Sequence, residues 1–565
     1  MKFYINKKYK NIDLNVLFKK NFLPDLNFDK IQIKKTATLS KENCFLKHCF
    51  KKHCFKIFNK SIRFKNKINW HQDFNSNITI PAWQNAYYQN IKIQALDNSS
   101  FKRFHPDIKI PWELSRLQHI PKLALVNDEN TFKNHINNWI DQNPFLIGVN
   151  WACPMDVAIR AINSIYGFHL FENKSLIDDQ FWNKLINSLY QHAIYLENNF
   201  EIFYKPNNHY IADLIGYFYL CFLFDHKKHF QKAKIKTYKK ILKQFDLQIQ
   251  EDGTSYEGST NYHKLVIEMF LHFYYLCKKN NLSLSDEFIT KLNKAQEFIQ
   301  DCADNSGNFV QIGDNDSGKI LNNPPIINNT PIKQPNKTMH YPNFGLTIIK
   351  NNDWHITYRH STYNKKQPTG HFHQDALSIT LTYKGIPILI DPGTYVYNSN
   401  KKWRNLMRGY NSHNTFYIDT ENIEAQDLFL LNKKEQNDTS QIIKEQNEIS
   451  IKNFAQHKHA IAYRELIFDR QKLFINDYWE NNLQEISSWN FIFHPKIELK
   501  KINENKFEIF YESEKIFYLE SSLIFLHKKG FYSREYGVIE KCPRLFAHKA
   551  IDKQKNKTVL YPTKT

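Results

Sequence analysis

The sequence has no apolar stretch long enough to cross a membrane. Its longest apolar run, residues 214–224, is well below the roughly 20 residues that a spanning helix needs. Residues 1–8 also lack the apolar core and the small-residue cleavage site of a signal peptide. We therefore expect no membrane span, and the N-terminus taken literally predicts a cytoplasmic protein. A misassigned start codon or export by another route would give the same N-terminal sequence.

Cysteine is scarce, with eight residues in a chain of 565. Five of them are too scattered to predict a disulfide scaffold: Cys153, Cys221, Cys277, Cys302 and Cys542. The other three lie with two histidines in a five-residue repeat between Cys44 and Cys54. Because the spacing matches no usual zinc finger, we interpret this repeat as a short tandem duplication with solvated lysines rather than a metal site.

Acidic residues are too few to balance the basic ones. Lysine and arginine number 77 against 56 aspartates and glutamates, which gives a formal net charge of +21. A basic surface attracts polyanions such as nucleic acid or acidic polysaccharide. The sequence is also rich in lysine, asparagine and isoleucine, as an AT-rich genome would impose, so the charge does not identify a partner. No recognisable nucleic-acid-binding module accompanies it, and we do not expect nucleic-acid binding.

The remaining composition is that of a folded protein, since 42% of its residues are hydrophobic. A chain of 565 residues should hold two or more domains. Between about residues 130 and 305, seven segments show helical periodicity and are joined by short polar loops. They begin near Thr131, Pro154, Asp179, His209, Gln231, Asn261 and Ser285. Such antiparallel helices form bundles, solenoids or α/α toroids. Because residues 211–224 are apolar on two sides, we favour the inner layer of a toroid.

The pattern changes from helical to strand-like after a proline-rich stretch. Residues 322–342 carry five prolines among asparagines, which predicts a linker or a long loop. Beyond it, alternating segments predict strands at 345–349, 354–358, 376–383 and 506–511, with a tight hairpin at 383–386. We therefore predict an α+β multidomain protein. An N-terminal (α/α) toroid precedes a C-terminal antiparallel β-sandwich, with a cleft between them.

Three histidines and two aspartates gather early in the predicted β-sandwich: His371, His373, Asp375, Asp391 and His413. His371 and His373 are two residues apart, so on a strand their side chains would point to the same side. Imidazoles with a carboxylate suit a divalent-metal site or an acid–base cluster. With 24 histidines in the chain, surface histidines grouped by chance are the plain alternative. We favour a functional cluster because turn sequences punctuate the surrounding strands regularly.

Two segments of the helical half place polar residues at predicted helix starts. In residues 205–210, Asn208 is either a helix N-cap or a functional amide. Residues 251–263 contain a glycine-rich turn, and Tyr262 in this segment is either a core aromatic with a satisfied hydroxyl or a functional phenol.

Taken together, these segments resemble the heparinase II/III superfamily of polysaccharide lyases, from about residue 65 to the C-terminus. The matching segments are PWELSR (111–116), NNHY (207–210), DG (252–253), STNYH (259–263), IGDNDSG (312–318), GHFHQDAL (370–377), DPGTY (391–395) and HNT (413–415). The resemblance implies a variable segment over residues 1–64, a toroid domain over 65–335 and a β-sandwich domain over 336–565. It also implies β-elimination at a uronic acid of an acidic polysaccharide, which leaves an unsaturated uronate end.

The resemblance implies catalytic roles for four residues. Asn208, helped by His209, would neutralise the uronate carboxylate, on which negative charge builds in the transition state. Tyr262 would act beside C5 and the glycosidic oxygen as acid, base or both, with His371 as its partner acid or base. Because an ordinary tyrosine has a pKa of about 10, we expect cationic neighbours to lower the pKa of Tyr262.

The resemblance also implies a structural zinc ion and no organic cofactor. Its ligands would be His373, Asp391 and His413, a donor set that suits zinc and would brace the loops facing the cleft. The residues themselves leave open which of His371 and His373 binds metal and which does chemistry. Relatives of this kind are secreted, so the resemblance implies a periplasmic or cell-envelope location, with the cytoplasm as the alternative.

Two other functions fit the same architecture. A glycoside hydrolase needs two carboxylic acids across the scissile bond, and Glu257 with Asp375 would supply them. A non-catalytic protein that binds or assembles acidic polysaccharide would keep the fold without turnover. We favour a lyase because Asn208, Tyr262 and His371 follow the lyase pattern. No motif identifies the polysaccharide.

Overall fold

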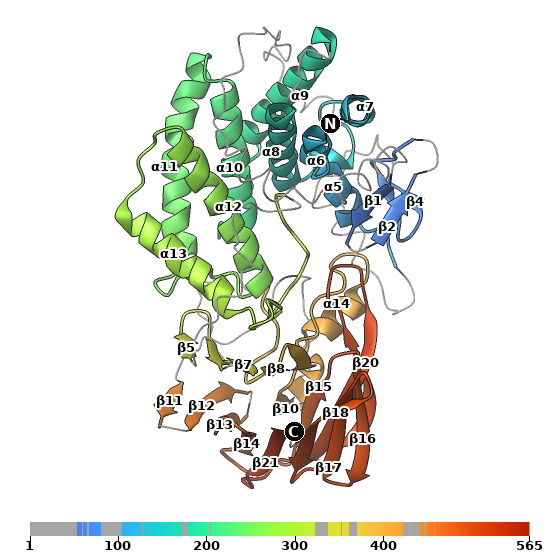
Figure 1. Cartoon of the computed structure of the whole chain (residues 1–565), viewed down its shortest axis with the longest axis vertical. Coiled ribbons are helices and arrows are strands. Elements are labelled where there is room, and N and C mark those ends of the chain that lie inside the picture. Colours follow the sequence, from blue (N-terminus) through green and yellow to red (C-terminus); the bar gives the residue numbers. More distant parts are fainter. Residues whose placement is uncertain are drawn as a thin grey trace.

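The computed structural model places helices in the N-terminal part of the chain and antiparallel sheets in the C-terminal part (Figure 1). It describes residues 54–58, 60–64, 67–80, 104–126, 128–171, 178–203, 205–321, 337–351, 353–360, 370–421, 429, 431, 440–445, 448–457 and 459–563. The predicted domain boundary at 335/336, most of the predicted segment 1–64 and most of the Cys44–Cys54 repeat lie outside the described residues.

The described helices of the N-terminal part are α5 (Lys109–Ser115), α6 (Ile120–Leu125), α7 (Glu129–Gln142), α8 (Pro154–Leu170), α9 (Asp179–Asn198), α10 (Asn208–Leu223), α11 (Lys228–Gln248), α12 (Thr260–Lys279) and α13 (Asp286–Asp301). The seven predicted helices are confirmed as α7 to α13, each beginning within three residues of its predicted start. Polar side chains fix several of these starts. Ser285, for example, accepts a hydrogen bond from the backbone N–H of Phe288 at the first turn of α13.

The helices pack in two layers. Helices α6, α8, α10 and α12 contact one another in succession. Helix α7 packs on α6, α9 on both α8 and α10, α11 on α10, and α13 on α12. Every residue of α8 is buried, as an inner helix requires. Gly216 of α10 lets the two inner helices approach closely, because a Cβ there would lie 2.5 Å from the Cβ of Ala158 on α8. The predicted toroid and the predicted inner position of residues 211–224 are both confirmed.

The described residues of the C-terminal part form three antiparallel sheets. The first runs in the order β5 (Lys337–Tyr341), β6 (Leu346–Lys350), β7 (Trp354–Arg359), β8 (Ile379–Tyr383) and β9 (Ile386–Leu389). The second runs β11 (Gln441–Lys444), β12 (Ile449–Gln456), β13 (Ile461–Phe468), β14 (Leu473–Trp479), β21 (Asn556–Pro562), β18 (Glu514–Ser521), β17 (Lys506–Tyr511) and β16 (Ile497–Asn503). The third runs β10 (Phe416–Ile418), β15 (Ile486–Ile492), β20 (Glu540–Ala550) and β19 (Leu526–Tyr532).

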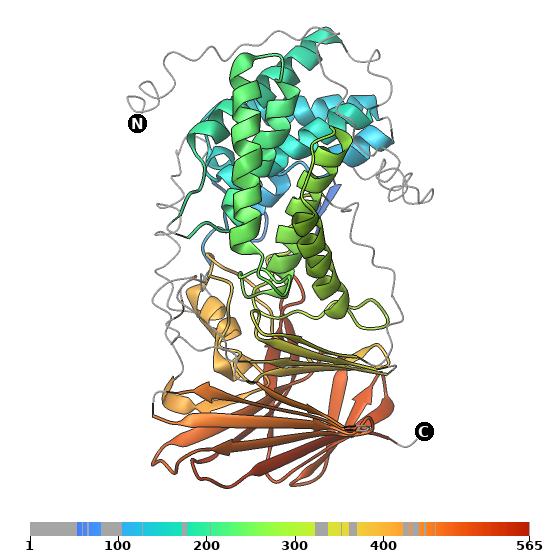
Figure 2. The ribbon, with the colours of Figure 1, turned by 90° about the vertical axis from the view of Figure 1, so that its left-hand side faces the viewer.

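The five-stranded sheet lies between the helices and the eight-stranded sheet (Figure 2). Trp354 of β7 packs against Phe468 and Phe517 of the larger sheet, with ring centroids 5.1 and 5.3 Å apart. This aromatic core confirms the predicted β-sandwich. The predicted hairpin is confirmed too, since Lys384 and Gly385 both have positive φ between β8 and β9.

Smaller elements complete the described structure. Two hairpins precede the helices, β1 (Cys54–Ile57) with β2 (Lys60–Arg63) and β3 (Gln72–Asp73) with β4 (Ile78–Thr79), and helix α14 (Lys401–Arg408) follows β9. Within the described ranges, no helix combines the length and the hydrophobicity of a membrane span. The cysteines of these ranges carry free thiols.

Candidate active site

A pocket lies where the helical and sheet parts meet. The helical part lines it with Lys109, Trp112, Arg116, Cys153, Met155, Asp156, Phe203, Asn207, Asn208, His209, Tyr262 and Asp316, and the C-terminal part with Gly370, His371, Tyr397, Asn398, Phe429 and Tyr536. The four residues predicted to be catalytic are therefore all in its wall. The three predicted metal ligands do not line it.

Helix α10 begins at the pocket with Asn208. The preceding Asn207 caps the helix by accepting a hydrogen bond from the backbone N–H of His209, so Asn208 is not the N-cap. The buried Glu257 carboxylate accepts hydrogen bonds from the backbone N–H of Asn208 (2.8 Å) and from its side-chain Nδ2 (3.1 Å). Glu257, whose role was not predicted from sequence, thereby orients the Asn208 amide. Among the residues that the structure describes, the buried Oδ1 of Asn208 has no hydrogen-bond partner, which leaves an acceptor for a donor group of a ligand.

His209 lies beside Asn208 and contacts a second carboxylate. Its Nδ1 is 2.9 Å from Oε2 of Glu201. The same oxygen accepts a hydrogen bond from the backbone N–H of Met155 (3.2 Å) and lies 3.7 Å from the thiol sulfur of Cys153. The imidazole is thus held at the pocket wall by Glu201, whose carboxylate is itself fixed by the segment of Cys153 and Met155.

Tyr262 of the helical part and His371 of the C-terminal part are in direct contact in the pocket. Their rings stack with centroids 3.4 Å apart and an interplanar angle of 15°. Tyr262 lies in the first turn of α12, and its hydroxyl is 3.1 Å from the hydroxyl of Tyr397. Burial raises the pKa of Tyr262 well above its ordinary value, and the Asp316 carboxylate adds to this effect. The expectation that cationic neighbours lower this pKa is therefore wrong for the substrate-free protein, in which the phenol keeps its proton.

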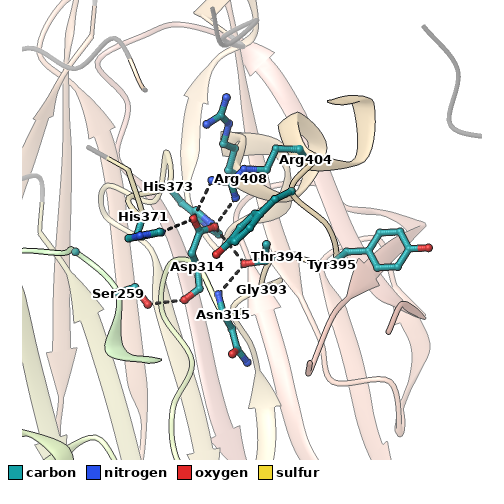
Figure 3. Close-up of polar contacts among 12 residues, drawn as sticks. Ser259, Asp314, Asn315, His371, His373, Gly393, Thr394, Tyr395, Arg404 and Arg408 are labelled. Carbon is teal, nitrogen blue, oxygen red and sulfur yellow. Dashed lines mark hydrogen bonds and ion pairs between the residues drawn. The ribbon is translucent and has the colours of Figure 1, made fainter. Parts of the chain in front are cut away.

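Asp314 connects the pocket to the structure behind it (Figure 3). Its carboxylate is 3.0 Å from Nδ1 of His371, 2.9 Å from Nε2 of His373 and 2.8 Å from Nη2 of Arg404. Burial opposes ionisation, but the Arg404 guanidinium and the two imidazoles hold the pKa of Asp314 well below its usual range. Neither Asp314 nor Arg404 was predicted as a site residue. The segment 312–318 pointed to the first, whereas no motif pointed to the second.

His371 and His373 do not lie on a strand, which was the condition for their side chains to point to the same side. They belong to an irregular segment that precedes β8, so the expected alternation of side chains does not apply. Both rings nevertheless reach one group, because each hydrogen-bonds to a different oxygen of Asp314. His371 lines the pocket, while His373 is completely buried.

His373, Asp391 and His413 form a buried group whose potential ligand atoms all lie within 4.8 Å of one another. Nδ1 of His373 is 3.2 Å from Nε2 of His413, which is 3.6 Å from Oδ2 of Asp391. The outer ring nitrogens face acceptors, Asp314 for His373 and the Gly409 carbonyl for His413. When each ring donates its N–H to that acceptor, the lone pairs of His373 Nδ1 and His413 Nε2 point toward each other and toward the Asp391 carboxylate. A cation bound between them stabilises this arrangement. The residues therefore fit a zinc ion.

The basic side chains of the α5 region that line the pocket are balanced by carboxylates. Nζ of Lys109 is 2.7 Å from Oδ2 of Asp316. Arg116 lies 2.6 Å from Oδ1 of Asp156 and 2.7 Å from Oε2 of Glu113. This part of the wall is a set of buried ion pairs rather than an open positive patch.

The two carboxylates considered for a hydrolase are not presented to the pocket. Glu257 accepts hydrogen bonds from Asn208, and Asp375 pairs with Arg359 at 3.1 Å. Neither residue lines the pocket. The arrangement gives no support to the pair of facing acids that glycoside hydrolysis requires.

Comparisons with solved structures show the same fold. A heparinase III structure aligns with a TM-score of 0.67 at 15% identity, covering 99% of this chain and 94% of that one. The heparan sulfate lyase HepC from Pedobacter heparinus aligns with a TM-score of 0.54 at 15% identity, covering 93% of this chain and 83% of that one.

Sequence comparisons reach the same group of proteins. The chain is 22% identical over 355 residues to a heparin-sulfate lyase of Pedobacter heparinus, a match that covers 56% of this chain and 53% of that protein. The chain thus matches about half the length of this relative. The model of the heparinase II/III N-terminus matches residues 2–314, and the model of the heparinase II/III-like C-terminal domain matches residues 333–537. The chain therefore belongs to the heparinase II/III family.

Proposed function

We propose that the protein is a polysaccharide lyase that cleaves a uronate-containing acidic polysaccharide by β-elimination. The convergence of Asn208, Tyr262 and His371 in one pocket carries this proposal. Similar proteins named as heparin-sulfate and heparan sulfate lyases support the reaction class. The alternative of a non-catalytic binding protein would not require these three side chains to meet.

The uronate carboxylate binds at the start of α10. Asn208 is the first residue of this helix, where the helix dipole favours an anion. The Asn208 amide presents its second Nδ2 hydrogen, beside the one donated to Glu257. With the neighbouring His209 it completes the set of polar groups facing the carboxylate. Stabilising its growing negative charge makes the C5 proton more acidic, which is the main requirement of the reaction.

Tyr262 and His371 divide the proton transfers. Asp314 accepts a hydrogen bond from Nδ1 of His371, which leaves Nε2 to act as the base that removes the C5 proton. The electron pair of the broken C5–H bond forms the C4–C5 double bond, and the C4–O bond breaks. Tyr262, which keeps its proton because burial raises its pKa, gives that proton to the departing oxygen.

A screen of purified protein against uronate-containing polysaccharides tests the proposal through the ultraviolet absorbance of the unsaturated product. We expect a rise with at least one polysaccharide, and a fall of about 10²-fold or more in Tyr262→Phe and in His371→Ala. New reducing ends without absorbance would instead indicate hydrolysis. Wild-type rates in both variants would contradict the assigned roles.

We also propose that His373, Asp391 and His413 hold a structural zinc ion. When bound, the ion supplies positive charge that ties the loop carrying His373 to the segments carrying Asp391 and His413. Metal analysis should find zinc in the purified protein, and His413→Ala should lower both the zinc content and the melting temperature. Protein without metal, together with an unchanged melting temperature in His413→Ala, would contradict the proposal.

A further inference from the structure

A second group of metal-ligating side chains lies at the pocket wall, on the helical side. Cys153, Glu201 and His209 place one potential ligand atom each within 4.8 Å of the others. The sulfur of Cys153 is 3.7 Å from Oε2 of Glu201 and 3.9 Å from Nδ1 of His209, and the oxygen and nitrogen are 2.9 Å apart. These residues share no member with the His373, Asp391 and His413 group.

The separations are close to those of a tetrahedral metal site. Zinc binds sulfur at about 2.3 Å and imidazole nitrogen or carboxylate oxygen at about 2.0–2.2 Å. At tetrahedral angles, these bond lengths place the ligand atoms about 3.3–3.6 Å from one another. The three observed separations bracket this range, so small side-chain movements are enough to seat an ion.

The surrounding structure holds the three ligands in place. Cys153 is the residue before α8, and His209 lies in the first turn of α10. Glu201 is fixed at both ends, because its Oε2 accepts from the backbone N–H of Met155 and its own N–H donates to Asp213. Cys153 and His209 line the pocket, so a remaining coordination position is open to water or to a ligand oxygen.

We propose that Cys153, Glu201 and His209 form a second divalent-metal site that takes a thiophilic cation such as zinc or cadmium. Binding forms a sulfur–metal bond and releases the thiol proton to solvent. The site does not depend on the proposed lyase activity, and binding is measured without any polysaccharide.

Cobalt(II) distinguishes this site from the histidine–aspartate group, because only a thiolate ligand gives an intense near-ultraviolet charge-transfer band. Metal-free full-length protein titrated with cobalt should develop this band. Cys153→Ser should lose the band and one equivalent of bound metal, while His413→Ala should keep the band. Glu201→Gln, which preserves the shape of the side chain, should weaken the binding that produces the band by about 10-fold or more.

A variant in which Cys44, Cys49 and Cys54 are all replaced by serine is the matched control. It tests whether the cysteine–histidine repeat, rather than Cys153, supplies the thiolate ligand. The band should remain unchanged in this variant. No thiolate band in the wild type would overturn the proposal. A band that survives in folded Cys153→Ser, or that disappears in the triple variant, would overturn it as well. Circular dichroism identifies the folded variants. If Cys153→Ser does not fold, the weaker cobalt binding expected in Glu201→Gln becomes the deciding measurement.

Discussion

A single carboxylate that does not line the pocket organises the residues around it. Asp314 is completely buried and receives hydrogen bonds from His371, His373 and the Arg404 guanidinium. It holds the His371 ring, which faces the pocket, and the His373 ring, which lies beside Asp391 and His413. The orientation of both histidines thus depends on one charged group whose own ionisation depends mainly on Arg404.

Replacing this carboxylate should destabilise the protein strongly. In Asp314→Asn, Arg404 becomes a buried cation without its anionic partner, which costs about 3–5 kcal/mol. Denaturant unfolding measures this loss. The matched control is Glu512→Gln, which breaks the exposed pair with Lys496 and should cost at most about 1 kcal/mol. Equal losses in both variants would show that the Asp314 network contributes little stability.

At the scale of secondary-structure elements, helices α8 and α10 pack so closely that the contact has no room for an additional methyl group. In Gly216→Ala the new Cβ would lie 2.5 Å from the Cβ and 2.7 Å from the Cα of Ala158, so the two inner helices must move apart. We expect a loss of about 1–3 kcal/mol in denaturant unfolding. Gly370→Ala is the control, because a Cβ there meets nothing within 4 Å. An unchanged stability in Gly216→Ala would mean that the helices separate freely.

Glu268 of α12 holds residues 320 and 321, which follow the helical part, through hydrogen bonds to their backbone. Its Oε1 accepts hydrogen bonds from the backbone N–H groups of Ile320 (3.2 Å) and Leu321 (3.1 Å). Burial raises the pKa of Glu268 from 4.5 to about 7. The folded state therefore binds this proton more tightly than the unfolded state, and the associated stability is full below pH 4.5 and lost as the pH rises through about 7.

Glu268→Gln should remove this pH dependence, because an amide does not ionise. Between pH 5 and pH 8, approximately, the wild type should lose on the order of 3 kcal/mol relative to the variant. Unfolding midpoints of both proteins across this range provide the measurement. Parallel pH profiles would show that Glu268 ionises as easily in the folded protein as in the unfolded one.

At the scale of the whole molecule, we expect the net charge of +21 to attract an anionic substrate over a long range. Lys109 and Arg116 of the pocket contribute little to this attraction. These two pocket cations already pair with carboxylates. Attraction of a polyanion should therefore be screened by salt. Once a substrate is identified, raising salt from about 50 to about 200 mM should increase KM severalfold and change kcat much less. A KM that is insensitive to salt would show that the basic surface does not recruit the substrate.

By itself the sequence determined the succession of elements and the candidate chemistry. Helices α7 to α13 and strand β17 were predictable because periodicity depends on neighbours a few residues apart. Asn208, Tyr262 and His371 were predictable because they stand in short motifs. The two-residue spacing of His371 and His373 did not predict their arrangement, since it does not reveal that a distant carboxylate orients both rings.

Only the tertiary structure decided how those residues work together. Asp314 and Arg404 are 90 residues apart in the chain, so no local pattern connects them. The pKa of Tyr262 was expected to fall but is raised, because it depends on burial and on carboxylates brought in by folding. The group of Cys153, Glu201 and His209 likewise exists only where separate segments converge. Short-range periodicity can be read from the sequence because it depends on neighbouring residues. The burial of a side chain, the charges around it and the geometry of a ligand group depend on distant segments that come together only when the chain packs.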